Sequence, residues 1–158
     1  MTRPCDVGLI SDTHGLLRPE ALAALRGVDA IIHAGDIGAP DVVDRLATIA
    51  PVTAVRGNND RGVWAEKFAA TEILEIGGVL VYVLHDVKEL DLDPRAAGMA
   101  AVIAGHSHQP RVEERDRVLY VNPGSAGPRR FRLPVAVGRL TVRNGRVRGR
   151  IIELEIAS

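Results

Sequence analysis

Five short segments of the chain carry the carboxylate, amide and imidazole side chains that bind divalent cations. Four of the five histidines fall within them, and each segment follows a run of apolar residues. Donors in this number are enough for two metal ions. The segments are Asp12-Thr13-His14, Gly35-Asp36, Gly57-Asn58-Asn59-Asp60, Leu84-His85-Asp86 and Gly105-His106-Ser107-His108.

The spacing within these segments suits chelation. Side chains two residues apart in an extended chain point the same way, so Asp12 and His14 can grip one ion together, as can His106 and His108. Open α/β sheets bind ligands beyond the carboxyl ends of their strands, so all five segments are expected at one edge. Asp36 is the best candidate to bridge two ions because a carboxylate has two oxygens. Such a pair of ions supports hydrolysis of phosphate esters.

Taken singly, these residues have simpler interpretations. Asp12 could cap a turn, Asn58 could be a turn residue, and His85 could be a polar residue that ends a strand. The Gly-His-Ser-His segment is more specific, and the joint occurrence of all five segments carries the metal hypothesis. His33 directly precedes Ala34-Gly35-Asp36, and we expect it to support that loop rather than to bind metal.

Apolar periodicity predicts alternating strands and helices in the first part of the chain and mainly β structure after residue 70. Strands are expected at 7–10, 30–32 and 52–55, and helices at 18–26 and 40–49. Hairpins are expected at 71–84 and 134–156, strands at 101–104 and 118–121, and a short helix at 93–98. Trp64 and Phe68, four residues apart, are expected to pack in the core, with an oligomer or partner surface as the alternative.

Composition predicts one globular domain over residues 1–158. The chain is 46% hydrophobic and has one cysteine, Cys5, so it cannot form an internal disulfide. No apolar run reaches the length of a membrane span, and the first residues do not resemble a secretory signal. We therefore expect a cytoplasmic protein with no membrane contact, and we leave a homo-oligomer open.

Charge is distributed unevenly, although its sum is zero. Residues 117–150 contain nine arginines and no acid, whereas residues 1–116 contain 18 acids against 11 Lys and Arg, a balance of −7. This basic tract could bind nucleic acid. The favoured interpretation is an exposed strand face that offsets acidic neighbours, because Arg146, Arg148 and Arg150 alternate and no aromatic residues interleave for base stacking. Nucleic acid is therefore not the expected partner.

The ordered set Asp-x-His, Gly-Asp, Gly-Asn-x-Asp, His and Gly-His-x-His resembles the calcineurin-like metallophosphoesterases. The runs Arg56-Gly57-Asn58-Asn59-Asp60 and Asn122-Pro123-Gly124-Ser125 are similar to those of its compact bacterial and archaeal phosphodiesterases. The resemblance implies an α/β fold in which two mixed β-sheets pack as a sandwich flanked by helices, in four αββα layers. It also implies a phosphodiesterase that hydrolyses a small phosphate ester with a hydroxide bridging two metal ions.

Carried over by position, the resemblance implies two ligand sets that share Asp36. The metal is expected to be Mn²⁺, with Fe, Ni, Co or Zn as alternatives. The first set is Asp12, His14, Asp36 and His108, and the second is Asp36, Asn58, His85 and His106. The resemblance also includes the retromer's phosphoesterase-like subunit, so a non-catalytic protein-binding scaffold is the alternative function.

One position departs from the larger family members, which carry a histidine directly after the ligand asparagine. Here that position is Asn59. With Asp36, it is our candidate catalytic residue. A neutral amide can hydrogen-bond phosphate but cannot donate a proton near pH 7, so activity is expected to depend on a good leaving group.

Overall fold

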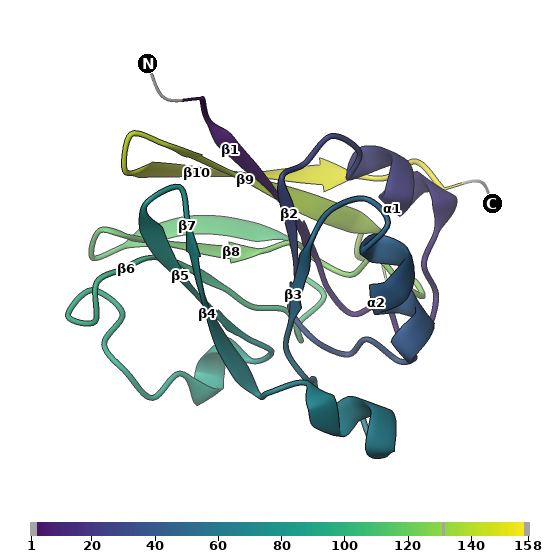
Figure 1. The fold of residues 1–158 in the computed structure, drawn as a ribbon. Helices are drawn as coiled ribbons and strands as arrows, with labels where there is room; N and C mark the ends of the chain where they lie inside the picture. The colour runs from purple at the N-terminus through teal and green to yellow at the C-terminus, as the bar shows by residue number, and fades with distance from the viewer. Residues whose placement is uncertain (1–2, 131, 157–158) are drawn as a thin grey trace.

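Two five-stranded β-sheets pack against each other in the computed structural model, which describes residues 3–130 and 132–156 (Figure 1). The first sheet has the order β10-β9-β1-β2-β3, with β1 at Cys5–Ile10, β2 at Ala30–His33, β3 at Val52–Ala54, β9 at Ala136–Arg143 and β10 at Arg146–Glu153. The second has the order β4-β5-β6-β8-β7, with β4 at Thr71–Ile76, β5 at Val79–Leu84, β6 at Met99–Ile103, β7 at Arg111–Arg115 and β8 at Val118–Asn122.

Both sheets are mixed, as predicted. Strands β1, β2 and β3 run parallel, as do β5, β6 and β8, while the remaining pairs are antiparallel. Aliphatic side chains from both sheets form the core between them, including Val7 and Leu9 from β1 and Val81 and Val83 from β5, all fully buried. Burial of these branched side chains stabilises the pairing of the sheets.

Two short helices cover the outer face of the first sheet, α1 at Pro19–Ala24 and α2 at Pro40–Leu46 (Figure 1). Each begins with proline in its first turn, where the missing N–H costs no hydrogen bond. The outer face of the second sheet carries the segment after β5, which contains the 3₁₀ turn η2 at Val87–Glu89. This fourth layer therefore consists of turns.

Several predicted elements differ in extent from those observed. The helix predicted at 93–98 is wrong: one i→i+4 bond forms, from Ala97 N to Asp93 O, and the chain then turns into β6. Strand β7 was not predicted. The helices predicted at 18–26 and 40–49 end earlier, at Ala24 and Leu46.

The segment that contains Trp64 and Phe68 forms a 3₁₀ helix, η1, at Val63–Lys67. The two rings meet edge to face with centroids 6.4 Å apart, and both pack against the core beneath α1 and α2. This arrangement agrees with core packing. Within the described residues, no helix is long and apolar enough to span a membrane.

Candidate metal centre

All seven predicted ligands follow the carboxyl ends of parallel strands. Asp12 and His14 follow β1, Asp36 follows β2, and Asn58 follows β3. In the second sheet, His85 follows β5, and His106 and His108 follow β6. The topology therefore brings segments from both sheets to one edge of the sandwich.

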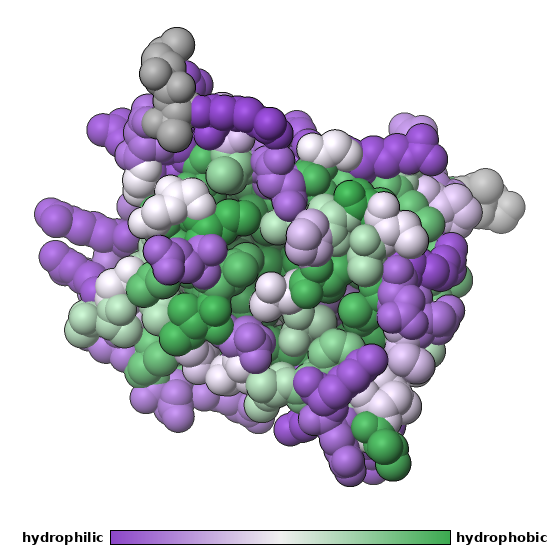
Figure 2. Space-filling model, in the orientation of Figure 1, coloured by the Kyte–Doolittle hydropathy of each residue, from purple (hydrophilic) through white to green (hydrophobic). Residues whose placement is uncertain are grey.

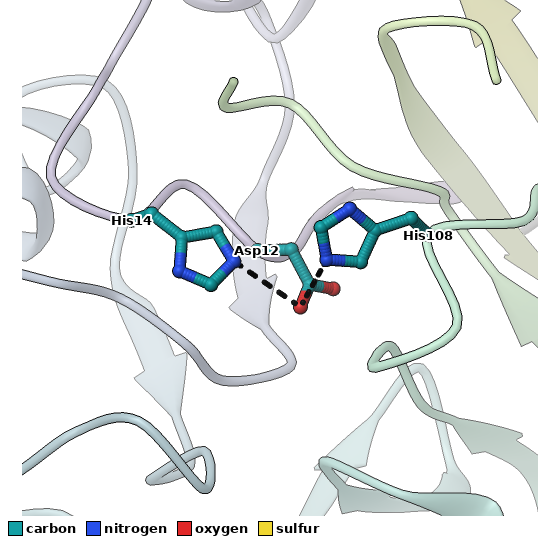
Figure 3. Close-up of side chains that lie close together, drawn as sticks. All are labelled: Asp12, His14 and His108. Atoms are coloured by element: carbon teal, nitrogen blue, oxygen red, sulfur yellow. Dashed lines mark ion pairs between the residues drawn. The ribbon is translucent and has the colours of Figure 1, made fainter. Parts of the chain in front are cut away.

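The carboxylate of Asp12 is fully buried and lies among three imidazoles. Its Oδ1 is 3.3 Å from His108 Nε2, 3.8 Å from His85 Nε2 and 3.9 Å from His14 Nε2. Figure 3 shows this carboxylate between the rings of His14 and His108. Oδ2 accepts hydrogen bonds from Ser11 Oγ (2.7 Å) and His106 N (3.1 Å), whereas Oδ1 has no hydrogen-bond partner among the described residues. A buried oxygen left open beside imidazole nitrogens fits a cation.

Asp36 provides a second carboxylate on the same side. Its Oδ2 is 3.3 Å from His85 Nε2 and 3.8 Å from His14 Nε2, so it faces one imidazole from each predicted ligand set. Ligand atoms lie within 4.8 Å of one another in two groups, Asp12-His14-His108 and Asp12-Asp36-His85. Asp12 belongs to both groups, whereas the sequence assigned the shared position to Asp36.

The ring of His85 is held in the tautomer that a metal ligand requires. Its Nδ1 lies 2.7 Å from Ala34 O, which can only accept, so Nδ1 carries the proton and Nε2 faces the carboxylates. Burial would lower the pKa of His85, but the nearby Asp36 and Asp12 carboxylates raise it above its ordinary value. A cation bound to His85 Nε2 would replace the proton that the Asp36 and Asp12 carboxylates stabilise there.

The pKa of Asp36 is shifted in the opposite direction. Burial raises the pKa of this carboxyl, but His85 and the Asn59 backbone N–H, which donates to Oδ1 at 2.9 Å, hold it well below its usual range. The pKa of Asp12 is also lowered, since contacts with His108 and His85 outweigh burial. The site therefore carries negative charge ready to bind a cation.

Five of the seven predicted ligands have left-handed backbone conformations, which L-residues rarely adopt. The φ angles are 56° for Asp12, 48° for His14, 55° for Asp36, 71° for His106 and 62° for His108. Among the described residues, three further non-glycine residues have positive φ, and all lie in the β7–β8 and β9–β10 turns. Strained conformations that cluster in one place indicate a functional site.

His106 and Asn58 lie at the edge of this cluster. The His106 side chain is 44% exposed, with Nε2 3.7 Å from Asp86 Oδ2 and its ring 5.2 Å from that of His85. Asn58 is exposed and lines a cavity of about 440 Å³ together with His85, Asp86 and His106. The structure therefore brings five predicted ligands into direct proximity and places the other two in the lining of this cavity.

Comparison with known proteins agrees with this geometry. The family model of the calcineurin-like phosphoesterase superfamily domain matches residues 6–145. The chain belongs to the calcineurin-like phosphoesterase superfamily. A probable metallophosphoesterase of Methanothermobacter thermautotrophicus is 37% identical over 131 residues, which cover 75% of this chain and 76% of that protein.

Solved structures share the fold. A structure described as a novel archaeal phosphodiesterase is 25% identical, with a TM-score of 0.76 over 93% of this chain and 99% of that one. Zinc-complexed Vps29 of Entamoeba histolytica is 22% identical, with a TM-score of 0.70 over 94% and 98% of the two chains. The second likeness concerns the fold alone.

Asp60 and Asn122 also support the site, although the sequence predicted no role for either. Asp60 is buried, and its carboxylate accepts from Ile37 N (3.0 Å), Gly38 N and Gly57 N (both 2.9 Å), which ties the loop after β3 to the loop after β2. Asn122 Nδ2 donates to Gly105 O (2.9 Å) and Ser107 Oγ (3.0 Å), which holds the loop that carries His106 and His108. The Asn-x-Asp spacing was the available signal for Asp60.

Asn59 contacts Asp36. Its Nδ2 lies 3.1 Å from Asp36 Oδ2, and its backbone N–H also donates to that carboxylate. In this structure the side chain therefore orients a predicted ligand, a role that the sequence did not suggest.

His33 supports the site, as expected, because it is fully buried and joins two ligand loops. Gly35 N donates to its Nδ1 at 3.1 Å, so Nε2 carries the proton and donates to Thr13 Oγ1 at 3.0 Å. Thr13 Oγ1 in turn donates to Ile37 O at 2.7 Å. In the neutral ring both nitrogens therefore have a hydrogen-bond partner. Burial lowers the pKa of His33 from 6.5 to about 4.

The buried, neutral His33 predicts a pH dependence of stability. Below pH 6.5 the unfolded chain protonates this ring, whereas the folded protein does so only near pH 4. The free energy of unfolding should therefore fall by roughly 1.4 kcal/mol per pH unit in this window, about 3 kcal/mol in all. Urea titrations of metal-free wild type and His33→Gln between pH 7 and 4 measure this, and the variant should lose that part of the slope. An unchanged slope would contradict the assignment.

Proposed function

We propose that this chain is a metal-dependent phosphodiesterase that hydrolyses small phosphate esters at a two-metal site. The observation that carries the proposal is the convergence of the Asp12 and Asp36 carboxylates with three imidazoles, where Asp12 Oδ1 and His85 Nε2 are buried without hydrogen-bond partners among the described residues. Two divalent cations, Mn²⁺ by our expectation, would acidify a water molecule and offset the charge of the phosphoryl oxygens.

The chain's own residues have separable tasks in this proposal. Asp12 and Asp36 supply the negative charge that holds cations, and His14, His85 and His108 supply neutral nitrogen donors. Asn58 and His106 complete the ligand set at the cavity edge. Ser11, Asn59 and Asp60 fix the carboxylates and their loops through hydrogen bonds. The cavity of about 440 Å³ gives the substrate access to Asn58, His85 and His106.

The test uses bis-p-nitrophenyl phosphate and p-nitrophenyl phosphate with purified protein. We expect the diester to be hydrolysed when Mn²⁺ is supplied and hydrolysis to stop with EDTA. Comparison of the two substrates separates diesterase from monoesterase preference. Absence of turnover with each of Mn²⁺, Fe²⁺, Co²⁺, Ni²⁺ and Zn²⁺ would overturn the proposal.

A protein-binding scaffold is the second candidate, and the fold likeness to Vps29 favours it. The set of seven predicted ligands weighs against it, because a scaffold does not need strained ligand loops around buried carboxylates. Metal binding alone does not separate the two candidates, since one of the Vps29 structures is itself a zinc complex. Turnover of the diester separates them.

Asn59→His tests how the leaving group is protonated. A histidine at this position can donate a proton near pH 7, which an amide cannot. The substrate is an alkyl p-nitrophenyl phosphate, which can lose either an alkoxide, a poor leaving group, or p-nitrophenolate, a good one. We expect the variant to release more alcohol relative to p-nitrophenol than wild type does. Loss of the Asn59 contact to Asp36 should lower both rates together, so the ratio is the informative quantity. An unchanged ratio would refute the leaving-group argument.

A further inference from the structure

Arginines crowd one face of the β9–β10 ribbon. The register places Arg146 opposite Arg143, Arg148 opposite Thr141 and Arg150 opposite Arg139. Residues directly opposite each other in antiparallel strands share a face, so these side chains lie together. The other face of β10 packs inward through Val147 and Ile151, so the arginines point away from the second sheet.

Three of these arginines have no acidic partner among the described residues, and Asp6, which pairs with Thr141 on the same face, accepts from the Thr141 hydroxyl at 3.0 Å. Arg139 is tied to the end of α1, where it donates to Ala24 O (3.1 Å) and Arg26 O (3.0 Å). Arg146, Arg148 and Arg150 are exposed, and none has an ion pair or hydrogen bond through its side chain within residues 3–130 and 132–156. Arg150 lies directly opposite Arg139, and like charges in that arrangement are destabilising, so an anion bound here would relieve the repulsion.

A cavity accompanies these side chains. Its volume is about 590 Å³, larger than that beside the metal centre, and it is lined by Pro4, Thr141, Arg143, Asn144, Arg146 and Arg148. It lies at the start of β1, where Cys5 pairs with Val142, whereas Asp12 follows the end of β1. Figure 2 shows hydrophilic side chains projecting along the edge where β9 and β10 lie. A ligand here is therefore distinct from a substrate on the metals.

We propose that Arg146, Arg148 and Arg150, here called the arginine face, bind the phosphates of single-stranded nucleic acid without sequence selectivity. Alternate residues on β10 are about 6.6–6.8 Å apart, a repeat that an extended single strand can follow with successive phosphates. The described residues that line the cavity include no aromatic side chain, which agrees with the sequence in excluding base stacking but leaves phosphate contacts open, and no large aliphatic side chain to insert into a membrane. Phosphate contacts alone therefore carry the binding.

Fluorescence anisotropy with a labelled thymidine strand of about 12 nucleotides tests the proposal. With about three phosphates neutralised, affinity should fall about twentyfold between about 50 and 200 mM salt. The triple variant R146Q/R148Q/R150Q should lose at least tenfold in affinity at low salt, and its salt dependence should flatten. The matched control R45Q/R95Q/R117Q removes three exposed arginines elsewhere and should retain both properties.

Three outcomes would overturn the proposal. Equal loss in the control would show a general charge effect, and binding that disappears with EDTA but returns with Mn²⁺ would place the strand at the metal centre. Binding to phosphatidylserine vesicles without binding to the strand would assign the face to lipid. A thermal shift gives an independent readout: the strand should raise the Tm of wild type and control, but not that of the triple variant.

Discussion

Asp36→Asn is expected to reduce diester hydrolysis at least about a thousandfold. The Asp36 carboxylate faces His14 and His85, one imidazole from each proposed ligand set. Its replacement by a neutral amide weakens both proposed sites and removes several kcal/mol of charge stabilisation, and each 1.36 kcal/mol corresponds to tenfold in rate. Metal content should fall from two ions per chain to less than one, as measured by elemental analysis with kinetics at saturating Mn²⁺.

Two further variants make this prediction specific. Asp44→Asn removes an exposed carboxylate from α2 and should leave activity and metal content unchanged. Asp12→Asn tests which carboxylate is shared, because Asp12 belongs to both ligand groups. If Asp36→Asn retained one ion and measurable activity while Asp12→Asn lost both ions, the bridging role would belong to Asp12.

The convergence of the candidate ligand segments could be predicted because each segment follows an apolar run that forms a strand. His85 and Asp36 follow β5 and β2, whose apolar runs are recognisable without tertiary information. Strand β7 has no such signal, since four of its five residues are exposed and the fifth is intermediate. The pairing of two sheets depends on contacts between distant segments, so it came from the family resemblance.

Within the site, the positions of the candidate ligands were easier to predict than their geometry. The left-handed conformations of Asp12 and His108 could not be predicted, because non-glycine residues rarely adopt a positive φ. The place of Asp12 in both ligand groups and the three hydrogen bonds accepted by Asp60 depend on how loops from separate strands meet. Such features are set by tertiary packing.

Gly57→Ala is expected to lower diester hydrolysis at least about a hundredfold, because a methyl group there occupies the space of a ligand. A Cβ on Gly57 would meet the backbone nitrogen and Oδ1 of Asp36, and Gly57 has no positive φ that would add backbone strain. Asp36 must then move, which misplaces its carboxylate and costs about 1–3 kcal/mol of stability. Steady-state kinetics with Mn²⁺ and urea unfolding measure the two effects.

Gly27→Ala is the matched control, because it separates backbone strain from obstruction of the site. Gly27 has a φ of 84°. Apart from its chain neighbours, no atom of residues 3–130 or 132–156 lies within 4 Å of the position that an added methyl group would take, so alanine there should cost about 1–2 kcal/mol of stability and leave hydrolysis unchanged. Near-wild-type turnover by Gly57→Ala would show that the loop after β3 can yield without disturbing Asp36. That result would show that the close contact between the loops after β2 and β3 does not determine the geometry of the metal centre.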